Sequence, residues 1–362
     1  MSVPPPPGPP GMPSPPAPPG PPPSASSLDT AQTKEITKKA FSENIVWVRT
    51  VDTCSVSEDG SGGVVFVKFK GNEYPPVVVK GTSTVVQEIF AFELAFLLDI
   101  KAPRYYIVNF TQREFRQIQH NLANKVGVRA GKITKELNRP FLIIMERVPA
   151  MDIFRIVRTN GPDKVAETVA DYMSNEHVLV EIGRIMILDV LLNNFDRFPL
   201  IWDNAGNLEN VLFSDTPEGN VYAIDQAIYP VSKLLQQNYD KYIGKVKTLV
   251  DDIIAEDWKV TADSPIAKVR DSIKQWTNFD LTDTHMQFIR RGILQAICDV
   301  IAKLDPASVQ KLKDKIACIG KIDWQNVFHD GLKAVQLEFV QDIVQIFHNN
   351  SEAVHKALKI IN

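Results

Sequence analysis

Residues 189–231 read DVLLNNFDRFPLIWDNAGNLENVLFSDTPEGNVYAIDQAIYPV, and the expected architecture of the chain is built outward from them. Apolar residues recur at helical spacing up to Leu192, where the polar pair Asn193 and Asn194 interrupts them. The acidic residue Asp196 follows this pair after a single phenylalanine. The pattern predicts a buried helix that ends at an edge of the core and places the Asp196 carboxylate there.

The same stretch contains two short β-like runs, residues 210–213 and 221–224, joined by a turn rich in Asp, Pro, Gly and Asn. The hairpin that they predict begins on Asn210 and ends on Asp225. Asp196, Asn210 and Asp225 are therefore expected at the ends of rigid elements, where they can meet a ligand. A carboxylate that accepts a hydroxyl proton, together with an Asn and an Asp that bind Mg²⁺, is the set of groups that protein kinases use.

The run from Glu209 to Phe213, the turn, and Asp225 with Gln226 after it resemble the catalytic-loop Asn, hairpin and metal-binding Asp of a protein kinase. Asp-Gln-Ala stands where those enzymes have Asp-Phe-Gly, and Asp196 precedes Asn210 by 14 residues, where the pattern H-R-D-x-x-x-x-N has five. The order Asp196-Arg197 is similar instead to that of atypical kinases, which include lipid kinases. With its proline-rich start, the chain is identified as similar to the catalytic domain of the actin-fragmin kinases, an atypical protein kinase family.

This resemblance implies a two-lobed α+β fold, with a small antiparallel-sheet lobe and a larger, mainly helical lobe. It implies ATP with Mg²⁺ or Mn²⁺ as cofactors, and transfer of the γ-phosphoryl group to a Ser/Thr hydroxyl, with threonine implied. The implied protein substrate is actin or an actin-fragmin complex, so that the activity would regulate actin filament capping and growth. We expect a disordered tail over residues 1–29, the small lobe over 30–148 and the helical lobe over 149–362.

The small lobe is predicted to begin with three antiparallel strands, residues 45–51, 64–69 and 77–80. The glycines between the first two, Gly60, Gly62 and Gly63, stand where a kinase has its glycine-rich loop, whose bare backbone can approach ATP phosphates. The pattern G-x-G-x-x-G is not met, and a plain hairpin turn is the competing interpretation.

Lys80 ends the third strand behind an apolar run, and a helix is predicted over residues 82–98. Val-Val-Val-Lys before a helix is the kinase pattern in which the lysine contacts the α- and β-phosphates and pairs with a helix Glu. Glu88 and Glu93 are the two acidic residues of this helix, and about 140° of helical rotation separates them. We expect Glu88 to be the partner of Lys80, and Glu93 remains the alternative.

Two further strands are predicted at residues 103–110 and 141–145, with a polar, basic helix-and-loop insertion between them whose charges are expected at the surface. Residues 146–149 then form the crossing between lobes, where the resemblance implies that backbone groups of Glu146 and Val148 meet adenine. Helices are predicted over residues 150–192 and again from residue 232 to the end.

Fourteen of the 25 prolines lie within residues 1–27, a segment without charge. Polyproline II is the expected conformation, and residues 4–23 are either a ligand for a proline-reading partner or a solvated spacer. The net charge of -3 provides no basic field for nucleic acid, and no apolar run is long enough to span a bilayer. We therefore expect a reduced, cytoplasmic and monomeric protein, and the resemblance implies association with the cytoskeleton.

The resemblance assigns Asp196 as the group that accepts or orients the hydroxyl proton, and Lys80 with Glu88 as the pair that positions the nucleotide. It assigns Asn210 and Asp225 to the metal. Two alternatives stay open: a nucleotide-binding pseudokinase that acts as a scaffold, and an inositol-lipid kinase. The second is disfavoured because no basic cluster follows Asp225 closely enough to meet a polyanionic headgroup.

Overall fold

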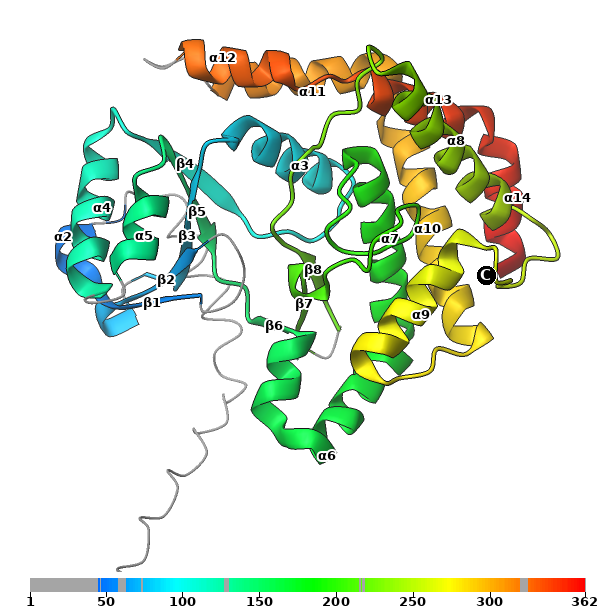
Figure 1. Cartoon of the computed structure of the whole chain (residues 1–362), viewed down its shortest axis with the longest axis horizontal. Coiled ribbons are helices and arrows are strands. Elements are labelled where there is room, and N and C mark those ends of the chain that lie inside the picture. Colours follow the sequence, from blue (N-terminus) through cyan, green and yellow to red (C-terminus); the bar gives the residue numbers. More distant parts are fainter. Residues whose placement is uncertain are drawn as a thin grey trace, which may run out of the picture.

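The computed structural model describes residues 45, 47–57, 63–72, 74–126, 130–214, 216, 219–319 and 325–361. Figure 1 shows a smaller lobe built on an antiparallel sheet and a larger lobe that consists mainly of helices. The expected two-lobed α+β fold is confirmed. The tail expected over residues 1–29, and the loop glycines Gly60 and Gly62, lie outside the described residues.

The sheet of the smaller lobe has five strands in the order β1-β2-β3-β5-β4, and every neighbouring pair is antiparallel. Strands were expected near all of these positions, and four of the five lie where the apolar runs predicted them. The strands are β1 (Val51–Val56), β2 (Val64–Phe69), β3 (Val77–Thr82), β4 (Tyr105–Asn109) and β5 (Phe141–Glu146).

The first strand is the exception, because the expectation of a strand over residues 45–51 was wrong. Residues Trp47–Thr50 form the short helix α2, and β1 begins only at Val51. Trp47 is fully buried, packs edge-on against Phe69 with ring centroids 5.7 Å apart, and donates its indole N–H to Glu114 at 2.9 Å. These contacts come from residues distant in sequence, and they override the local apolar pattern.

Successive side chains of β5 point to opposite faces of the sheet, and each face packs into a different hydrophobic core. Leu142 and Ile144 belong to the small-lobe core under α4 (Arg113–Val126) and α5 (Ala130–Leu137). Phe141 and Ile143 belong instead to the core that continues into the larger lobe. The predicted basic insertion is thus two amphipathic helices, and α4 buries one face on the sheet through Phe115, Ile118 and Leu122.

Helix α3 (Val85–Leu97) lies on the side of the sheet that faces the larger lobe, and its apolar side chains join the core of that lobe. Two helices from the C-terminal part of the chain, α11 (Pro306–Ile319) and α12 (Gln325–Ala334), pack against it (Figure 1). A Cβ on Gly331 of α12 would stand 2.8 Å from Val86 Cγ2 of α3, so the two helices touch without a gap. The C-terminal helices therefore hold α3 in place.

The larger lobe begins with a small sheet of order β6-β7-β8. Helices were predicted over residues 150–192 and from residue 232, and helices indeed dominate both ranges, but residues 150–152 form β6 instead. Its elements are β6 (Ala150–Asp152), α6 (Ile153–Ser174), α7 (Glu176–Leu192), β7 (Val211–Ser214), β8 (Val221–Ala223), α8 (Gln236–Ile253), α9 (Pro265–Thr277), α10 (Asp283–Lys303), α11 (Pro306–Ile319), α12 (Gln325–Ala334), α13 (Glu338–Asn349) and α14 (Ser351–Ile361).

Helices α7 and α10 form the centre of this lobe and cross at two glycines. A Cβ on Gly183 would stand 2.2 Å from the Ile289 carbonyl oxygen, and a Cβ on Gly292 would stand 2.0 Å from the Val180 carbonyl oxygen. No other residue type allows backbones to approach so closely. Helix α7 ends at Leu192, and Asn193 caps it with a left-handed φ of 51° that turns the chain toward the site.

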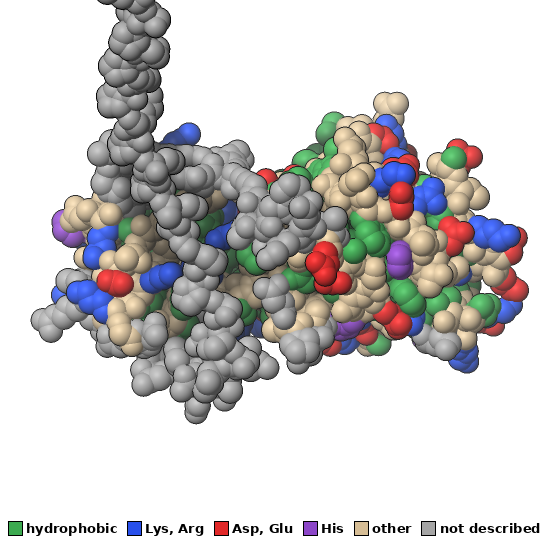
Figure 2. All heavy atoms as spheres, turned by 90° about the horizontal axis from the view of Figure 1, so that it is seen from below, with side chains coloured by type: hydrophobic (Ala, Val, Ile, Leu, Met, Phe, Trp, Pro, Cys, Tyr) green, Lys and Arg blue, Asp and Glu red, His purple; other side chains and the backbone are tan. Residues whose placement is uncertain are grey.

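On the face drawn in Figure 2, lysine and arginine side chains lie interspersed with aspartate and glutamate side chains over the helical lobe. Within the described part of the chain, every helix is either too short or too polar to cross a membrane.

Candidate active site

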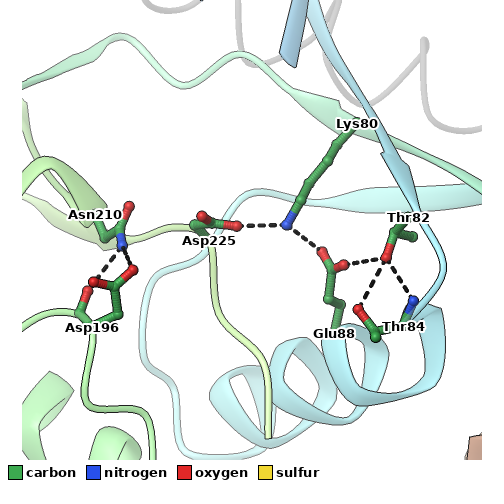
Figure 3. A network of polar contacts seen from close by, with 7 residues as sticks. All are labelled: Lys80, Thr82, Thr84, Glu88, Asp196, Asn210 and Asp225. Carbon is green, nitrogen blue, oxygen red and sulfur yellow. Dashed lines mark hydrogen bonds and ion pairs between the residues drawn. The ribbon is translucent and has the colours of Figure 1, made fainter. Parts of the chain in front are cut away.

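Lys80 and Glu88 come from adjacent elements that the sheet register and the helix phase bring together. Lys80 pairs with Ile143 across the β3/β5 ladder, and its side chain extends toward α3. Its Nζ lies 2.7 Å from Glu88 Oε2, and the Glu88 carboxylate is buried. The structure therefore places Glu88, rather than Glu93, beside Lys80 (Figure 3).

The second oxygen of Glu88 also has a partner, which fixes the carboxylate in one orientation. Thr82 Oγ1 donates to Glu88 Oε1 at 2.5 Å, and the same hydroxyl oxygen accepts the Thr84 amide at 3.0 Å. Glu93 faces elsewhere, where it accepts from the Tyr105 hydroxyl at 3.0 Å and pairs with Lys315 of α11 at 2.7 Å. Thr82 and Thr84 were not predicted as site residues, although both begin the predicted helix.

Lys80 has a second carboxylate partner, which comes from the larger lobe. Its Nζ lies 2.5 Å from Asp225 Oδ1, so one ammonium joins α3 to the end of β8 (Figure 3). Burial alone would lower the pKa of Lys80, but the charges of Glu88 and Asp225 outweigh it and hold that pKa above its usual value. Burial likewise acts to raise the pKa of Asp225, and the charge of Lys80 brings it below its usual value instead. Lys80 and Asp225 are therefore charged at neutral pH.

The β7/β8 hairpin sets Asn210 and Asp225 at the same end of its ladder. Val211 pairs with Ala223, and the Ile224 amide donates to the Asn210 carbonyl oxygen at 3.1 Å. Asp225 has a left-handed φ of 51°, which is uncommon for a residue other than glycine. This conformation turns the carboxylate, about half of whose side-chain surface is open to solvent, toward Lys80.

Asp196 and Asn210 meet although 14 residues separate them. Asn210 Nδ2 donates to the Asp196 Oδ2 at 3.0 Å and to its carbonyl oxygen at 2.9 Å. The buried Asn194 side chain accepts the Asp196 amide at 3.2 Å, which holds the loop from the other side. All three of the side chains predicted at the ends of elements are therefore brought to one place (Figure 3).

The 14-residue spacing between Asp196 and Asn210 is accommodated by a closed loop that runs from Arg197 to Asn207. The Asn207 amide donates to the Arg197 carbonyl oxygen at 2.9 Å, and Gly206 packs on that carbonyl with a left-handed φ of 72°. The far side of the loop is anchored to helices of the larger lobe, since Asp203 pairs with Lys245 at 2.8 Å and with Lys268 at 2.9 Å. The insertion thus projects away from Asp196 and does not displace it.

Arg197 forms a buried ion pair with Asp189 of α7. Arg197 Nε donates to Asp189 Oδ1 at 3.0 Å, Arg197 Nη2 lies 2.9 Å from the same oxygen, and neither side chain is exposed. Burial raises the pKa of Asp189 to about 7 despite the guanidinium beside it. This ion pair connects the loop to the C-terminal end of α7. Because Arg197 directly follows Asp196 in the chain, the pair also holds the backbone next to Asp196 in place.

The surroundings of Asp196 raise the pKa of its carboxyl group above the usual value. Partial burial raises its pKa, the negative charge of Asp225 raises it further, and hydrogen bonds from the Asn210 and Asn207 side chains act in the opposite direction. Asn207 was missed by the sequence analysis. Its signal is local, because an Asn two residues before Glu209 can cap a turn, and its Oδ1 indeed accepts the Glu209 amide at 3.1 Å.

The donor set of Asn210 and Asp225 fits a hard divalent cation. Asn210 turns its Nδ2 toward Asp196, so that its Oδ1 points away from that carboxylate, and Asp225 supplies charged oxygens (Figure 3). Carboxylate and amide oxygens are ligands that Mg²⁺ accepts, and it usually completes its shell with water and phosphate oxygens. These residues are therefore compatible with the metal that the kinase reaction requires.

The crossing between the sheets carries the two residues expected near adenine. The Glu146 amide donates to the Arg104 carbonyl oxygen at 2.9 Å, and the Val148 carbonyl accepts the Ala150 amide at 2.9 Å. No acceptor among the described residues takes the Val148 N–H, so this group is available to a ligand. Of the predicted loop glycines, Gly63 is described: it is buried and directly precedes β2.

The arrangement agrees with what comparison with known proteins finds. A family model described as the catalytic domain of actin-fragmin kinase matches residues 26–297. A Dictyostelium discoideum protein named as a candidate actin-fragmin kinase is 26% identical over 316 residues, which cover 83% of this chain and 72% of that relative. A second such protein from the same organism is 21% identical over 281 residues, 74% of this chain and 62% of the relative.

The chain thus spans less than two thirds of the second relative, whose remaining length it does not match. The family match covers both the small-lobe sheet and the hairpin that carries Asn210 and Asp225. The chain belongs to the actin-fragmin kinase catalytic family, and this membership supports a kinase function.

Proposed function

We propose that this protein is an ATP-dependent protein kinase that transfers the γ-phosphoryl group to a threonine or serine hydroxyl on actin or an actin-fragmin complex. One observation carries the proposal: Lys80 joins Glu88 of the small lobe to Asp225 of the large lobe, beside the Asp196–Asn210 pair (Figure 3). This is the order and the set of charged groups that phosphoryl transfer needs. The family name supports the choice of substrate and the association with the cytoskeleton.

Each residue has a role that follows from its contacts. Glu88, fixed by Thr82, holds the Lys80 ammonium where it would neutralise the α- and β-phosphates. Asn210 and Asp225 would hold Mg²⁺, which when bound neutralises charge on the phosphate oxygens. The Val148 amide and the Gly63 backbone would contact the adenine and phosphate parts of the nucleotide. Gly60 and Gly62, which lie outside the described residues, belong to the same proposed loop. Asp196 would orient the acceptor hydroxyl and accept its proton.

A protein acceptor is favoured over an inositol lipid because two of the lysines that follow Asp225 are already engaged. Lys233 pairs with Asp342 at 3.0 Å and lies over the Tyr239 ring, and Lys245 pairs with Asp203 at 2.8 Å. A polyanionic headgroup needs several free cations in one place. The assignment of threonine rests on the family resemblance.

The experiment is transfer of radiolabel from γ-labelled ATP to the actin-fragmin complex, to actin alone and to inositol lipid vesicles, with wild type and Asp196→Asn in parallel. We expect wild type to label the protein complex. Asp196→Asn keeps the shape of the side chain and removes its basicity, so the rate should fall by about 10²–10⁴-fold, the range for loss of a general base. Nucleotide binding, measured by calorimetry, should persist in the variant.

Labelled lipid without labelled protein would replace the proposal with the inositol-lipid kinase. If wild type binds ATP but labels no acceptor, the pseudokinase scaffold is the correct interpretation, and Asn210 and Asp225 are nucleotide ligands only. Equal rates for wild type and Asp196→Asn would remove Asp196 from the catalytic residues.

A further inference from the structure

Two aromatic rings flank the candidate active site at the solvent boundary. Phe195 directly precedes Asp196, and Tyr229 follows Asp225 by four residues. Their ring centroids lie 5.2 Å apart with the planes tilted by 42°, so the two loops meet through this pair. Phe195 is 43% exposed and Tyr229 is 41% exposed, although each has a partner ring.

Phe195 is exposed because of the path that the loop takes, since another phenylalanine of the same loop is buried. Phe198, three residues further on, is 1% exposed and packs in the main core. The loop therefore buries one phenylalanine and leaves the other at the surface beside Asp196. Large apolar side chains that stay exposed next to a site with several polar groups often mark the place where a ligand binds.

The backbone beneath both rings is held by hydrogen bonds. The Tyr229 amide donates to the Leu192 carbonyl oxygen at 2.8 Å, and the Tyr229 carbonyl accepts Asn193 Nδ2 at 3.0 Å. The Phe195 carbonyl accepts Asn204 Nδ2 at 2.6 Å. The rings thus start from fixed positions, and a partner that binds them loses little free energy to ordering of the loops.

The rings also lie close to the reacting groups. Phe195 is the neighbour of Asp196 in the chain, and its ring centroid lies 5.2 Å from that of Tyr229, so both rings lie beside this carboxylate. In agreement with this position, partial burial raises the pKa of the Tyr229 hydroxyl and the negative charges of Asp225 and Asp196 raise it further. An acceptor hydroxyl that reaches Asp196 must therefore bring its neighbouring residues past the two rings. In a protein acceptor, those neighbours include side chains that an aromatic surface can bind.

We propose that Phe195 and Tyr229 form an aromatic platform that binds an apolar side chain next to the acceptor hydroxyl of a protein substrate, and so selects the acceptor sequence. This inference rests on the proposed kinase function. The occupant is a segment of a polypeptide, because a bare inositol headgroup offers no apolar group to the rings. The platform is a binding surface, and the proton acceptor remains Asp196.

The test measures initial rates with γ-labelled ATP on two acceptors, the actin-fragmin complex and a Ser/Thr peptide library in which each flanking position is fixed in turn as leucine, phenylalanine or aspartate. The variants are Phe195→Ala, Phe195→Leu, Tyr229→Ala and Tyr229→Phe. Leu234→Ala is the matched control, since Leu234 is 91% exposed on the same segment as Tyr229 but outside the ring pair.

Wild type should prefer an apolar residue at one flanking position. Phe195→Ala and Tyr229→Ala should erase that preference and raise KM for the acceptor by about tenfold, the usual effect of truncating an aromatic residue that anchors an interface. The kcat should change less than KM. Tyr229→Phe keeps the ring and should behave as wild type, Phe195→Leu should lie between wild type and Phe195→Ala, and Leu234→Ala should match wild type.

The failures of this inference and of the kinase proposal are distinguishable. If wild type labels an acceptor and both alanine variants keep its KM and sequence preference, the platform is overturned and the kinase function stands. If Tyr229→Phe loses as much as Tyr229→Ala, the hydroxyl matters rather than the ring, and the platform is likewise overturned. If wild type labels neither acceptor, the kinase proposal fails and the platform fails with it.

Discussion

The groups around Asp196 act on the pKa of its carboxyl group in opposite directions. Partial burial and the charge of Asp225 raise its pKa, whereas the Asn207 and Asn210 side chains lower it by hydrogen bonding to the carboxylate. A base is active only when deprotonated, so transfer should decline as the pH falls through this raised pKa. The decline is expected at a higher pH than for a solvent-exposed aspartate.

Asn207→Ala removes one hydrogen bond to the carboxylate and should raise the pKa of Asp196 further. The acidic limb of the pH profile of kcat should therefore move to higher pH. Asn204→Ala is the matched control, because Asn204 lies in the same loop but donates to the Phe195 carbonyl. An unchanged limb in Asn207→Ala, or an equal displacement in both variants, would contradict this role of Asn207.

The buried pair of Asp189 and Arg197 predicts an asymmetric response to mutation. Asp189→Leu leaves the guanidinium buried without a countercharge and should cost about 3–5 kcal/mol of unfolding free energy. Arg197→Met should lower the unfolding free energy by less than this at low pH. Burial already raises the pKa of Asp189 to about 7, so the Asp189 carboxyl group can stay neutral without the guanidinium. The double variant should recover much of the loss caused by Asp189→Leu.

Urea denaturation at pH 6 and pH 8 checks this prediction. A group whose pKa is raised by folding favours the folded state while it is protonated, and it loses that contribution as the pH rises through the folded value. In Arg197→Met the loss of the guanidinium charge should raise the pKa of Asp189 further, so the variant should lose more stability at pH 8 than at pH 6, relative to wild type. Equal losses at both pH values would mean that Asp189 stays ionised.

At the scale of elements, the crossing of α7 and α10 depends on two glycines. Gly183→Ala and Gly292→Ala would each drive a Cβ into a backbone carbonyl of the facing helix. Separation of the helices should cost at least about 1–3 kcal/mol and lower the midpoint of urea denaturation.

Gly244→Ala supplies the matched control for this crossing, since Gly244 lies in α8 and a Cβ there meets nothing within 4 Å. That variant should gain about 0.5–1 kcal/mol from helix propensity alone. A stable Gly183→Ala variant would show that the crossing can widen without loss.

The elements differ in how far the sequence predicts them. Helices α7 and α3 and the β7/β8 hairpin follow from apolar periodicity and turn residues. Asn210 and Asp225 are found because they flank the hairpin, and Lys80 is found because an apolar run precedes it and a helix follows, although β3 continues to Thr82. Strand β1 is an edge strand that buries only one of its six residues, so its apolar signal is weak.

The loop between Asp196 and Asn210 was beyond prediction for a different reason. Its closure depends on Gly206 packing against the Arg197 carbonyl and on the pairing of Asp203 with lysines of α8 and α9. These are tertiary contacts, and no local pattern encodes them. The same holds for the pairing of Arg197 with Asp189, which follows from the path of the loop.

For the whole molecule, the packing of α12 on α3 couples the C-terminal helices to the position of Glu88. Gly331→Val would place a branched side chain against Val86 and should lift α12 from α3. We expect faster hydrogen exchange in the amides of α3 and a severalfold lower rate of phosphoryl transfer, although no site residue is changed. Gly244→Val controls for the cost of a β-branched residue in a helix.

The prediction fails if hydrogen exchange in α3 is unchanged in Gly331→Val and if its rate of phosphoryl transfer falls no more than that of Gly244→Val. Helix α12 would then not be needed to hold Glu88 near Lys80. The two variants differ only in whether the new side chain meets a neighbour. Their comparison therefore separates the contact between helices from helix propensity.

The contact between α11 and α3 also has a consequence for the order in which the protein is made. Lys315 of α11 bonds to Glu93 of α3 across a separation of 222 residues. A ribosome adding 5–20 residues per second needs roughly 10–40 seconds to produce that length of chain. During this interval the nascent α3 has emerged but the helices that cover it have not, so the N-terminal lobe is expected to reach its final packing only after the C-terminal helices are released. Until then, α3 is an expected binding site for chaperones that recognise exposed apolar segments.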